Sequence, residues 1–373
     1  MAHIEKRGAG RWRARYRGPD GHEWSRTFNL KKEAESFIVE KQAELAHGTW
    51  LDPKRGKQTF ETWVVKYLAG AHHKRPTTMA RDRVVVDRHL VPALGQRPIA
   101  SITPLDVQRV VDEMATTHAP ATVRTNYGVL RAVLNAAVAA DLIARSPCRG
   151  VHLPAARRPR IRFLSADELK RLAATTDVEY RPMIYLAGVL GLRWSEVVGL
   201  RVGRINFFRE TLEVAETIAD VAGETISADV KSPASRRTLA VPPFVVAMLS
   251  EHLKRRGLSA ADPDALVFVA PQGGPLRAAN FRRRVWAPAI QRAGLDGLTF
   301  HGLRHTSVGL MIEVGAHIEV IKQRLGHSSI RVTSDTYGAL LPGVDASVTL
   351  GLDGLFHPRG LSAASEESSQ TPS

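Results

Sequence analysis

Residues 301–306 read His-Gly-Leu-Arg-His-Thr, a stretch that combines two histidines and an arginine on one predicted helix. His301 and Arg304 are three residues apart, so a helix places them on the same face. Taken alone, such a pair is most often structural or solvated. Its meaning depends on the polar residues that precede and follow it in the same part of the chain.

Two segments before this stretch carry further cationic side chains. Residues 191–196 read Gly-Leu-Arg-Trp-Ser-Glu, with Arg193 shortly after a helix-breaking glycine. Glu196 lies three residues beyond Arg193, at a spacing that lets a carboxylate hold a guanidinium. Lys231 lies in Val-Lys-Ser-Pro, between two runs of strand-like composition. A lone cation in so basic a chain is usually a solvated charge, so only the combination is informative.

Two segments after the stretch add a histidine and a tyrosine. His327 follows Leu-Gly, a helix stop that leads into a new cap. Tyr337 comes ten residues later in Asp-Thr-Tyr-Gly, and of the six tyrosines it alone follows both histidine segments. Each piece is weak by itself, but together they form the ordered series Arg, Lys, His-x-x-Arg, Gly-His and Tyr.

This series resembles the catalytic signature of the tyrosine recombinases, and specifically of the phage-type integrases. Gly-Leu-Arg-x-x-Glu matches the family's first catalytic arginine, His-x-x-Arg its central pair and Asp-Thr-Tyr-Gly its nucleophile. The six positions of the family's catalytic set are filled by Arg193, Lys231, His301, Arg304, His327 and Tyr337. After Tyr337 comes Gly-Ala-Leu, where many relatives carry a histidine, but that position is outside the six.

The resemblance implies a site-specific DNA recombinase that cleaves and rejoins strands through a 3′-phosphotyrosine at Tyr337. A phenol of pKa ~10 is only about 0.1% ionised at neutral pH, so this nucleophile needs help from a base or a proton relay. The covalent bond conserves the energy of the phosphodiester, so no ATP is required. We expect no cofactor and no metal, since no His, Cys, Asp or Glu cluster has metal-ligand spacing.

The resemblance also implies a role for each remaining catalytic position. Arg193 and Arg304 are expected to clamp the non-bridging oxygens of the phosphate in bidentate fashion. Lys231, on a hairpin, is expected to be the acid for the 5′ leaving oxygen. His301 and His327 are expected to hydrogen-bond the phosphate or take the tyrosine proton. Glu196 is expected to stand behind Arg193 and hold it.

The charge of the chain agrees with a DNA substrate. Its 52 Lys and Arg against 37 Asp and Glu give a net charge of +15 and a pI ≈ 10.3. A soluble chain this basic most often binds nucleic acid, a cationic enzyme with another substrate being the alternative. The single cysteine, Cys148, excludes an internal disulfide framework. With no signal peptide and no apolar run of membrane-spanning length, we expect the bacterial cytoplasm, on nucleoid DNA, and no membrane.

Residues 1–56 predict a small basic sheet followed by a helix. Two runs that alternate in character, 11–17 and 22–28, flank a Gly-Pro-Asp-Gly turn, and a helix is expected over 31–46. The segment is similar to the arm-type DNA-binding domain of phage integrases, whereas a solvated cationic edge strand is the alternative. The predicted DNA-binding residues are Arg11, Arg13, Arg15, Arg17 and Arg26.

The rest of the chain divides into a helical domain, a linker and a mixed domain. Residues 57–150 predict an all-α domain, and His-Leu-Val-Pro-Ala-Leu-Gly-Gln-Arg-Pro-Ile at 89–99 looks like the family's core-binding domain. Residues 151–162, rich in Pro and Arg, predict a linker. Residues 163–343, where strand-like runs lie between helical patterns, predict a mixed α+β, mainly helical catalytic domain. The fold class is therefore multidomain.

The C-terminal residues predict a short docking helix and a tail. Val344, Val348, Leu352 and Leu355 form an apolar stripe over 344–356. We expect this helix to dock on a neighbouring protomer, with docking on its own domain as the alternative. Residues 357–373 are predicted to be disordered because of their composition.

The interpretation is a phage or prophage integrase that acts on core and arm sites of double-stranded DNA. The resemblance implies a homotetramer that passes through a Holliday junction, with a host DNA-bending protein and an excision factor as accessory partners. Two alternatives remain open: a type IB topoisomerase-like enzyme, and a catalytically inactive DNA-binding regulator of the same fold. The N-terminal block argues against the first, and six filled catalytic positions argue against the second.

Overall fold

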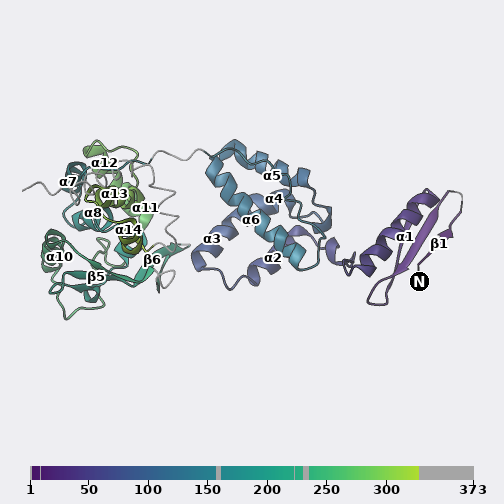
Figure 1. Ribbon diagram of the computed structural model, residues 1–373, viewed down its shortest axis with the longest axis horizontal. Helices are drawn as coiled ribbons and strands as arrows, with labels where there is room; N and C mark the ends of the chain where they lie inside the picture. The colour runs from purple at the N-terminus through teal and green to yellow at the C-terminus, as the bar shows by residue number, and fades with distance from the viewer. Residues whose placement is uncertain (1, 9, 157–160, 222, 230–234, 327–373) are drawn as a thin grey trace, which may run out of the picture. The chain divides into compact units, whose positions relative to one another are not determined.

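The chain divides into two compact units, Met1–Arg158 and Pro159–Ser373. Each unit buries hydrophobic cores of its own and is described by itself. No described helix combines the length and the apolar composition needed to cross a membrane. The computed structural model (Figure 1) describes residues 2–8, 10–156, 161–221, 223–229 and 235–326.

The N-terminal segment is a three-stranded antiparallel sheet in the order β1 (His3–Lys6), β2 (Trp12–Arg17) and β3 (Glu23–Phe28). The helix α1 (Lys31–Ala46) packs against it, mostly on β2. Alternate residues of β2 point toward α1 and form a small core with it, because successive side chains of a strand face opposite ways. The predicted hairpin and helix are confirmed, and β1 adds a third strand that composition did not indicate.

The next segment is all helical, as predicted. A π-helical turn, Val86–Leu90, joins its second and third helices without a break. The hydroxyl of Thr103 accepts a hydrogen bond from the Asp106 amide, and the Asp106 carboxylate accepts one from the Thr103 amide. This reciprocal cap explains where the fourth helix begins. The helices are α2 (Phe60–Ala69), α3 (Pro76–Val85), α4 (Val91–Leu94), α5 (Pro104–Thr117) and α6 (Pro120–Ala139).

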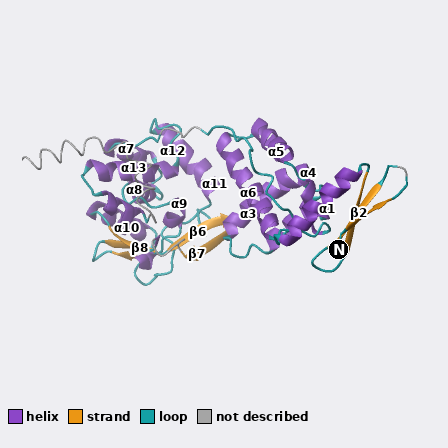
Figure 2. Cartoon of the chain, turned by 45° about the vertical axis from the view of Figure 1, so that its right-hand side comes forward, coloured by secondary structure: helices purple, strands orange, loops and turns teal. Residues whose placement is uncertain are grey.

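The second unit is mixed and mainly helical, as predicted. Ser165 and Glu168 form a capping box at the start of its first helix. The helix α8 is buried along most of its length and is contacted by α7, α10 and α13. Figure 2 shows these helices on one side of the unit and its strands on another. The helices are α7 (Ala166–Thr175), α8 (Arg181–Gly188), α9 (Trp194–Val198), α10 (Pro243–Arg255), α11 (Ala278–Phe281), α12 (Ala287–Arg292), α13 (Phe300–Glu313) and α14 (Ile318–Leu325).

The strands of the second unit belong to two separate antiparallel sheets. One sheet has the order β4 (Ile205–Asn206), β5 (Thr211–Val214) and β8 (Arg237–Ala240), and the other is the hairpin β6 (Glu216–Val221) and β7 (Glu224–Asp229). The strand-like run 211–218 is divided between the two sheets, because the chain leaves the first sheet at Ala215 and pairs in the second. The predicted docking helix and tail lie outside the described residues.

Candidate active site

The arginine of the His-x-x-Arg stretch is buried, and its hydrogen bonds connect three segments of the chain. Arg304 lies on α13 with 2% of its surface exposed. Its guanidinium donates hydrogen bonds to the carbonyl of Gly191 and, at 2.6 Å, to the carbonyl of Leu325. A buried guanidinium needs such acceptors, because an unpaired buried charge is strongly unfavourable. Arg304 therefore connects α13 to the loop before α9 and to the end of α14.

Gly191 occupies a position that only glycine fits. Its φ is +73°, in the left-handed region that side chains rarely adopt. A Cβ at this position would lie 2.7 Å from both Leu325 Cδ2 and Ser307 Oγ. The glycine of the Gly-Leu-Arg motif thus lets the loop approach α13 and α14 closely enough for Arg304 to reach its carbonyl.

Glu196 holds Arg193 as the sequence predicts. Arg193 precedes the first turn of α9, where its backbone amide donates to Glu196 Oε2 at 2.9 Å. Its guanidinium Nη1 donates to Glu196 Oε1 at 2.8 Å. The Glu196 side chain is only 2% exposed, whereas that of Arg193 is 35% exposed. Arg193 is therefore anchored at one end and accessible from solvent.

A second arginine, Arg237, shares the same carboxylate, and sequence reasoning did not assign it a role. Its Nη1 and Nη2 donate to the two oxygens of Glu196 at 3.2 and 3.0 Å. Its Nε donates to the Arg324 carbonyl near the end of α14 at 2.6 Å. The alternation of side chains along β8 is a signal that could have identified it. Leu239 is buried and its neighbours are exposed, so Arg237, two residues before Leu239, lies on the same inward face.

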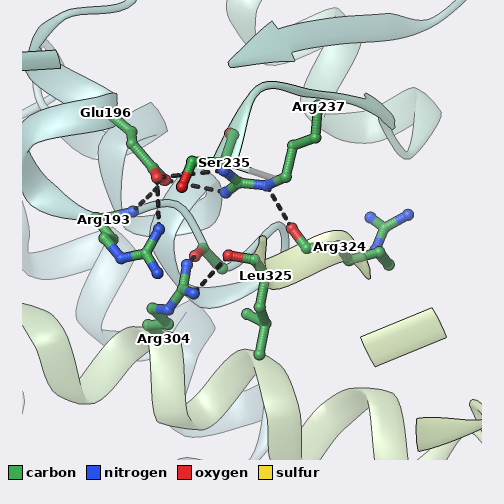
Figure 3. A network of polar contacts seen from close by, with 8 residues as sticks. Arg193, Glu196, Ser235, Arg237, Arg304, Arg324 and Leu325 are labelled. Carbon is green, nitrogen blue, oxygen red and sulfur yellow. Dashed lines mark hydrogen bonds and ion pairs between the residues drawn. The ribbon is translucent and has the colours of Figure 1, made fainter. Parts of the chain in front are cut away.

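These contacts keep Glu196 ionised. Burial alone would raise the pKa of its carboxyl, but the hydrogen bonds and charges of Arg237 and Arg193 hold that pKa below its ordinary value. Figure 3 shows the carboxylate between the two arginines, with Arg304 close by. The cluster thus contains three guanidinium groups and one carboxylate, an excess of positive charge suited to an anionic group.

The two histidines of the stretch pack against each other on α13. The ring centroids of His301 and His305 are 5.0 Å apart in an edge-to-face arrangement. Partial burial and the charges of Arg304 and Arg193 lower the pKa of His301. Burial, His301 and Arg304 lower the pKa of His305 to about 4. His301 is therefore a neutral imidazole at physiological pH and lies near both arginines.

The other predicted catalytic residues, Lys231, His327 and Tyr337, lie outside the described residues. The structure does describe the residues that lead to His327. The helix α14 ends at Leu325, and the next residue, Gly326, is in the left-handed conformation with φ 64°, directly before His327. This confirms the predicted helix stop. Within the described parts of the chain, no three His, Cys, Asp or Glu side chains are placed to hold a metal ion.

The N-terminal arginines do not form one equivalent row. Arg13 and Arg15 lie on the face of β2 opposite the one that carries Ala14 and packs on α1. Arg15 is already paired with Glu5 at 3.1 Å and Glu23 at 2.8 Å.

The three remaining predicted DNA-binding residues differ in their surroundings. Arg26 is opposite Ala14 in the sheet and so lies on the other face, where its guanidinium covers the rings of Phe28 and Phe37 at 5.3 and 5.8 Å. Arg11 is exposed before β2, and Arg17, at the end of β2, is exposed as well. Successive side chains of a strand face opposite ways. Arg26 is an even number of residues from the side chains that face α1, so it lies on their face of the sheet and not on the face of Arg13 and Arg15.

Comparisons with known proteins agree with this architecture. The Phage integrase family model matches residues 162–342, the Phage integrase central domain model 58–152, and the Phage integrase N-terminal domain model 3–47. An integrase of Mycobacterium phage D29 is 29% identical over 341 residues, covering 87% of this chain and 89% of the relative.

Solved structures share the fold. A Tn1549 transposon integrase in complex with a circular intermediate DNA has a TM-score of 0.65 at 17% identity, covering 74% of this chain and 94% of that one. A lambda integrase tetramer bound to a Holliday junction has a TM-score of 0.54 at 16% identity, covering 87% of this chain and 95% of that one. These chains thus have a fold similar to the one described here.

Proposed function

This chain belongs to the phage integrase family of tyrosine recombinases, and from that premise we propose how it cleaves and rejoins DNA at specific sites. The observation that carries the proposal is the cluster in which Arg193 and Arg304 meet beside a single carboxylate. Arg304 is held by two carbonyls, and Arg193 is held at Nη1 only, as far as the described residues show. A partly exposed guanidinium with donors to spare is what a scissile phosphate requires.

In the cleavage step, the phenol oxygen of Tyr337 attacks phosphorus and the bond from phosphorus to the 5′ oxygen breaks. The leaving 5′ oxygen takes a proton from Lys231, and the 3′ end stays on the protein as a phosphotyrosine. Negative charge grows on the non-bridging oxygens during attack, and Arg193 and Arg304 stabilise it; one such donor is worth ~3–4 kcal/mol. Rejoining is the reverse step, with a 5′ hydroxyl as the nucleophile, so neither ATP nor a metal is needed.

His301 is the proton acceptor in this mechanism. Its pKa is lowered, so its imidazole is neutral at physiological pH and can take the phenol proton. His327, two residues after the end of α14, completes the contacts to the phosphate in this mechanism. Both histidines keep the roles that the family resemblance implies.

The assembly follows from the same family. We assign the segment 1–56 to arm sites and the segment 57–150 to core sites of double-stranded DNA. The lambda integrase of the solved complex is a tetramer on a Holliday junction, which supports four protomers here. A host DNA-bending protein and an excision factor are proposed accessory partners, and the bacterial cytoplasm, on nucleoid DNA, is the proposed location.

The test is covalent adduct formation on nicked core-site DNA, read on a denaturing gel. The wild-type chain should give a protein–DNA adduct, and Tyr337→Phe should give none while still shifting DNA on a native gel. The matched control is Tyr185→Phe, which removes a hydroxyl elsewhere in the same unit and should keep the adduct. An adduct formed by Tyr337→Phe would overturn the assignment. A shift without any wild-type adduct would favour a non-catalytic binder.

A further inference from the structure

We propose that Arg237 is a positioning residue of the recombination reaction, one that sets Arg193 for the phosphate and holds the chain on both sides of the site. The proposal rests on the proposed function, because it concerns the same phosphate. It starts from the geometry of a single guanidinium that is buried, fully engaged and located at the junction of three segments (Figure 3).

The first step is that the Arg237 side chain is buried and that each of its guanidinium nitrogens donates a hydrogen bond. Its side chain is 7% exposed, so it cannot contact DNA directly. Both Nη atoms bond the carboxylate of Glu196, Nε bonds the Arg324 carbonyl, and Nη1 also bonds the Ser235 carbonyl at 3.1 Å. When all three nitrogens of a guanidinium donate hydrogen bonds, its planar group is held in one orientation. A lysine, with a single nitrogen, cannot make this set of bonds.

The second step is the effect on Arg193. The Glu196 carboxylate is 2% exposed and carries a full charge that must be balanced. With Arg237 in place, Arg193 supplies only Nη1 and its backbone amide to that carboxylate. Without Arg237, Arg193 would be the remaining cation for a buried anion, and its guanidinium would turn inward. Arg237 thus leaves Nε and Nη2 of Arg193 available for the phosphate.

The third step is the connectivity of the chain. Arg237 opens β8, six residues after Lys231. Its Nε bond to Arg324 holds the last turn of α14, three residues before His327. The one side chain therefore connects the start of β8, the Glu196 carboxylate that also binds Arg193, and the last turn of α14.

The experiment compares Arg237→Lys with Arg236→Ala, a neighbouring control. Arg236 is 61% exposed and its guanidinium pairs with Glu213, away from Glu196. Each variant, and the wild type, is given two nicked core-site DNAs. One carries the normal scissile phosphate, mapped from the wild-type adduct, and the other a neutral methylphosphonate there. DNA affinity is measured on the same preparations.

On normal DNA, Arg237→Lys should form adduct at least tenfold more slowly at saturating DNA, with affinity within about threefold of wild type. On methylphosphonate DNA, where less negative charge develops during attack, the substitution should slow adduct formation much less. The rate on normal DNA divided by the rate on methylphosphonate DNA should therefore fall at least tenfold. Both rates come from one preparation, so this ratio does not depend on the fraction of folded protein. Arg236→Ala should keep the wild-type ratio.

An unchanged ratio in Arg237→Lys would overturn the proposal, whatever the variant's stability, because a structural defect lowers both rates equally. A tenfold fall in Arg236→Ala as well would also overturn it, since the effect would then not be specific to the Glu196 contact. Absence of any adduct with the wild-type chain would instead be the failure of the proposed function, and the two failures are thereby distinguished.

Discussion

The carboxylate of Glu196 lies between Arg193 and Arg237 in the described part of the second unit. It accepts hydrogen bonds from two guanidinium groups and one backbone amide, while almost none of it is exposed. A buried ion pair of this kind adds little net stability over an apolar replacement, but removing one partner is costly. At the residue scale, Glu196 therefore acts by fixing where Arg193 and Arg237 lie.

Glu196→Ala should lower the free energy of unfolding of the second unit by about 3–5 kcal/mol, because it leaves Arg237 buried without its partner. Glu196→Gln should cost less, since it keeps the shape and part of the hydrogen bonding. Because the pKa of Glu196 is lowered on folding, its ionic contribution exists above the ordinary carboxyl pKa and disappears as the pH falls through the folded value. Urea unfolding at neutral pH and at roughly pH 3 measures both effects. A loss near zero for Glu196→Ala at neutral pH would contradict this account.

At the scale of elements, helix ends do most of the positioning. The end of α14 is held by Arg304 at the Leu325 carbonyl and by Arg237 at the Arg324 carbonyl. These are carbonyls that a helix leaves without intrahelical partners, and here two arginines from distant segments satisfy them. The start of α5 is held in the opposite way, by the carboxylate of Asp106.

Asp106→Asn should destabilise the helical segment of the first unit. Hydrogen bonds from Thr103 lower the pKa of Asp106 to about 2 despite burial, and Arg97 adds an ion pair. A carboxylate with this folded pKa stabilises the fold above about pH 3.8, by up to about 2 kcal/mol, and loses that contribution as the pH falls toward 2. Hydrogen exchange of α5 amides in the full chain, in urea at neutral pH, measures the loss.

The control for that prediction is Asp112→Asn, which changes an exposed carboxylate on the same helix, where Gln108 is its hydrogen-bond donor. It should alter the exchange of α5 by less than about 0.5 kcal/mol. Equal effects of the two substitutions would mean that the hydrogen bonds of Asp106 at the start of α5 add nothing to the effect of removing one negative charge from the helix.

At the scale of the whole molecule, the chain combines segments with different chemistry. The N-terminal sheet presents arginines on an open face, although Arg15 is already neutralised by two glutamates. The mixed unit places Arg193, whose side chain is 35% exposed, and Arg237, whose side chain is 7% exposed, on the carboxylate of Glu196, with the buried Arg304 close by. We expect the N-terminal segment to bind DNA through solvated cations, and the mixed unit to hold the phosphate with arginines that are fixed by buried hydrogen bonds.

Removal of residues 1–57 should leave cleavage of core-site DNA intact, while integration between complete sites fails. The deletion takes away the basic sheet and none of the proposed catalytic residues. Fewer phosphate contacts release fewer counterions, so the affinity for full sites should fall less steeply with salt. Binding titrations at several salt concentrations measure this slope, and an unchanged slope would count against a DNA role for the segment.

Deletion of residues 344–373 should abolish tetrameric synapsis while single protomers still bind core DNA. A short helix with an apolar stripe is marginal by itself and needs a groove to dock in. Deletion of 357–373 only is the control and should have almost no effect. Native gels of protein with core-site DNA separate monomer, dimer and tetramer complexes. Normal synapsis by the longer deletion would refute docking on a neighbouring protomer.

Local spacing was sufficient to predict the features that depend on neighbours in the chain. The β-hairpin and the helix that follows it at the N-terminus, the helix stop before His327 and the pairing of Arg193 with Glu196 follow from turn chemistry and helical period. The same spacing carried the family resemblance. The division of 211–218 between two sheets could not be predicted in this way, because strand partners come from elsewhere in the chain.

The partners of the buried charges were decided by folding. Arg237 meets Glu196 across 41 residues of sequence, and Arg304 meets Gly191 across 113. The neutralisation of Arg15 by Glu5 and Glu23 likewise depends on which strands pair, and the placement of Arg26 over Phe37 depends on the packing of α1 on the sheet. A guanidinium looks the same in a sequence whether it ends in solvent or in a core. Only the packing of distant segments determines which arginines lose their water, and hence which of them position others and which remain available to bind phosphate.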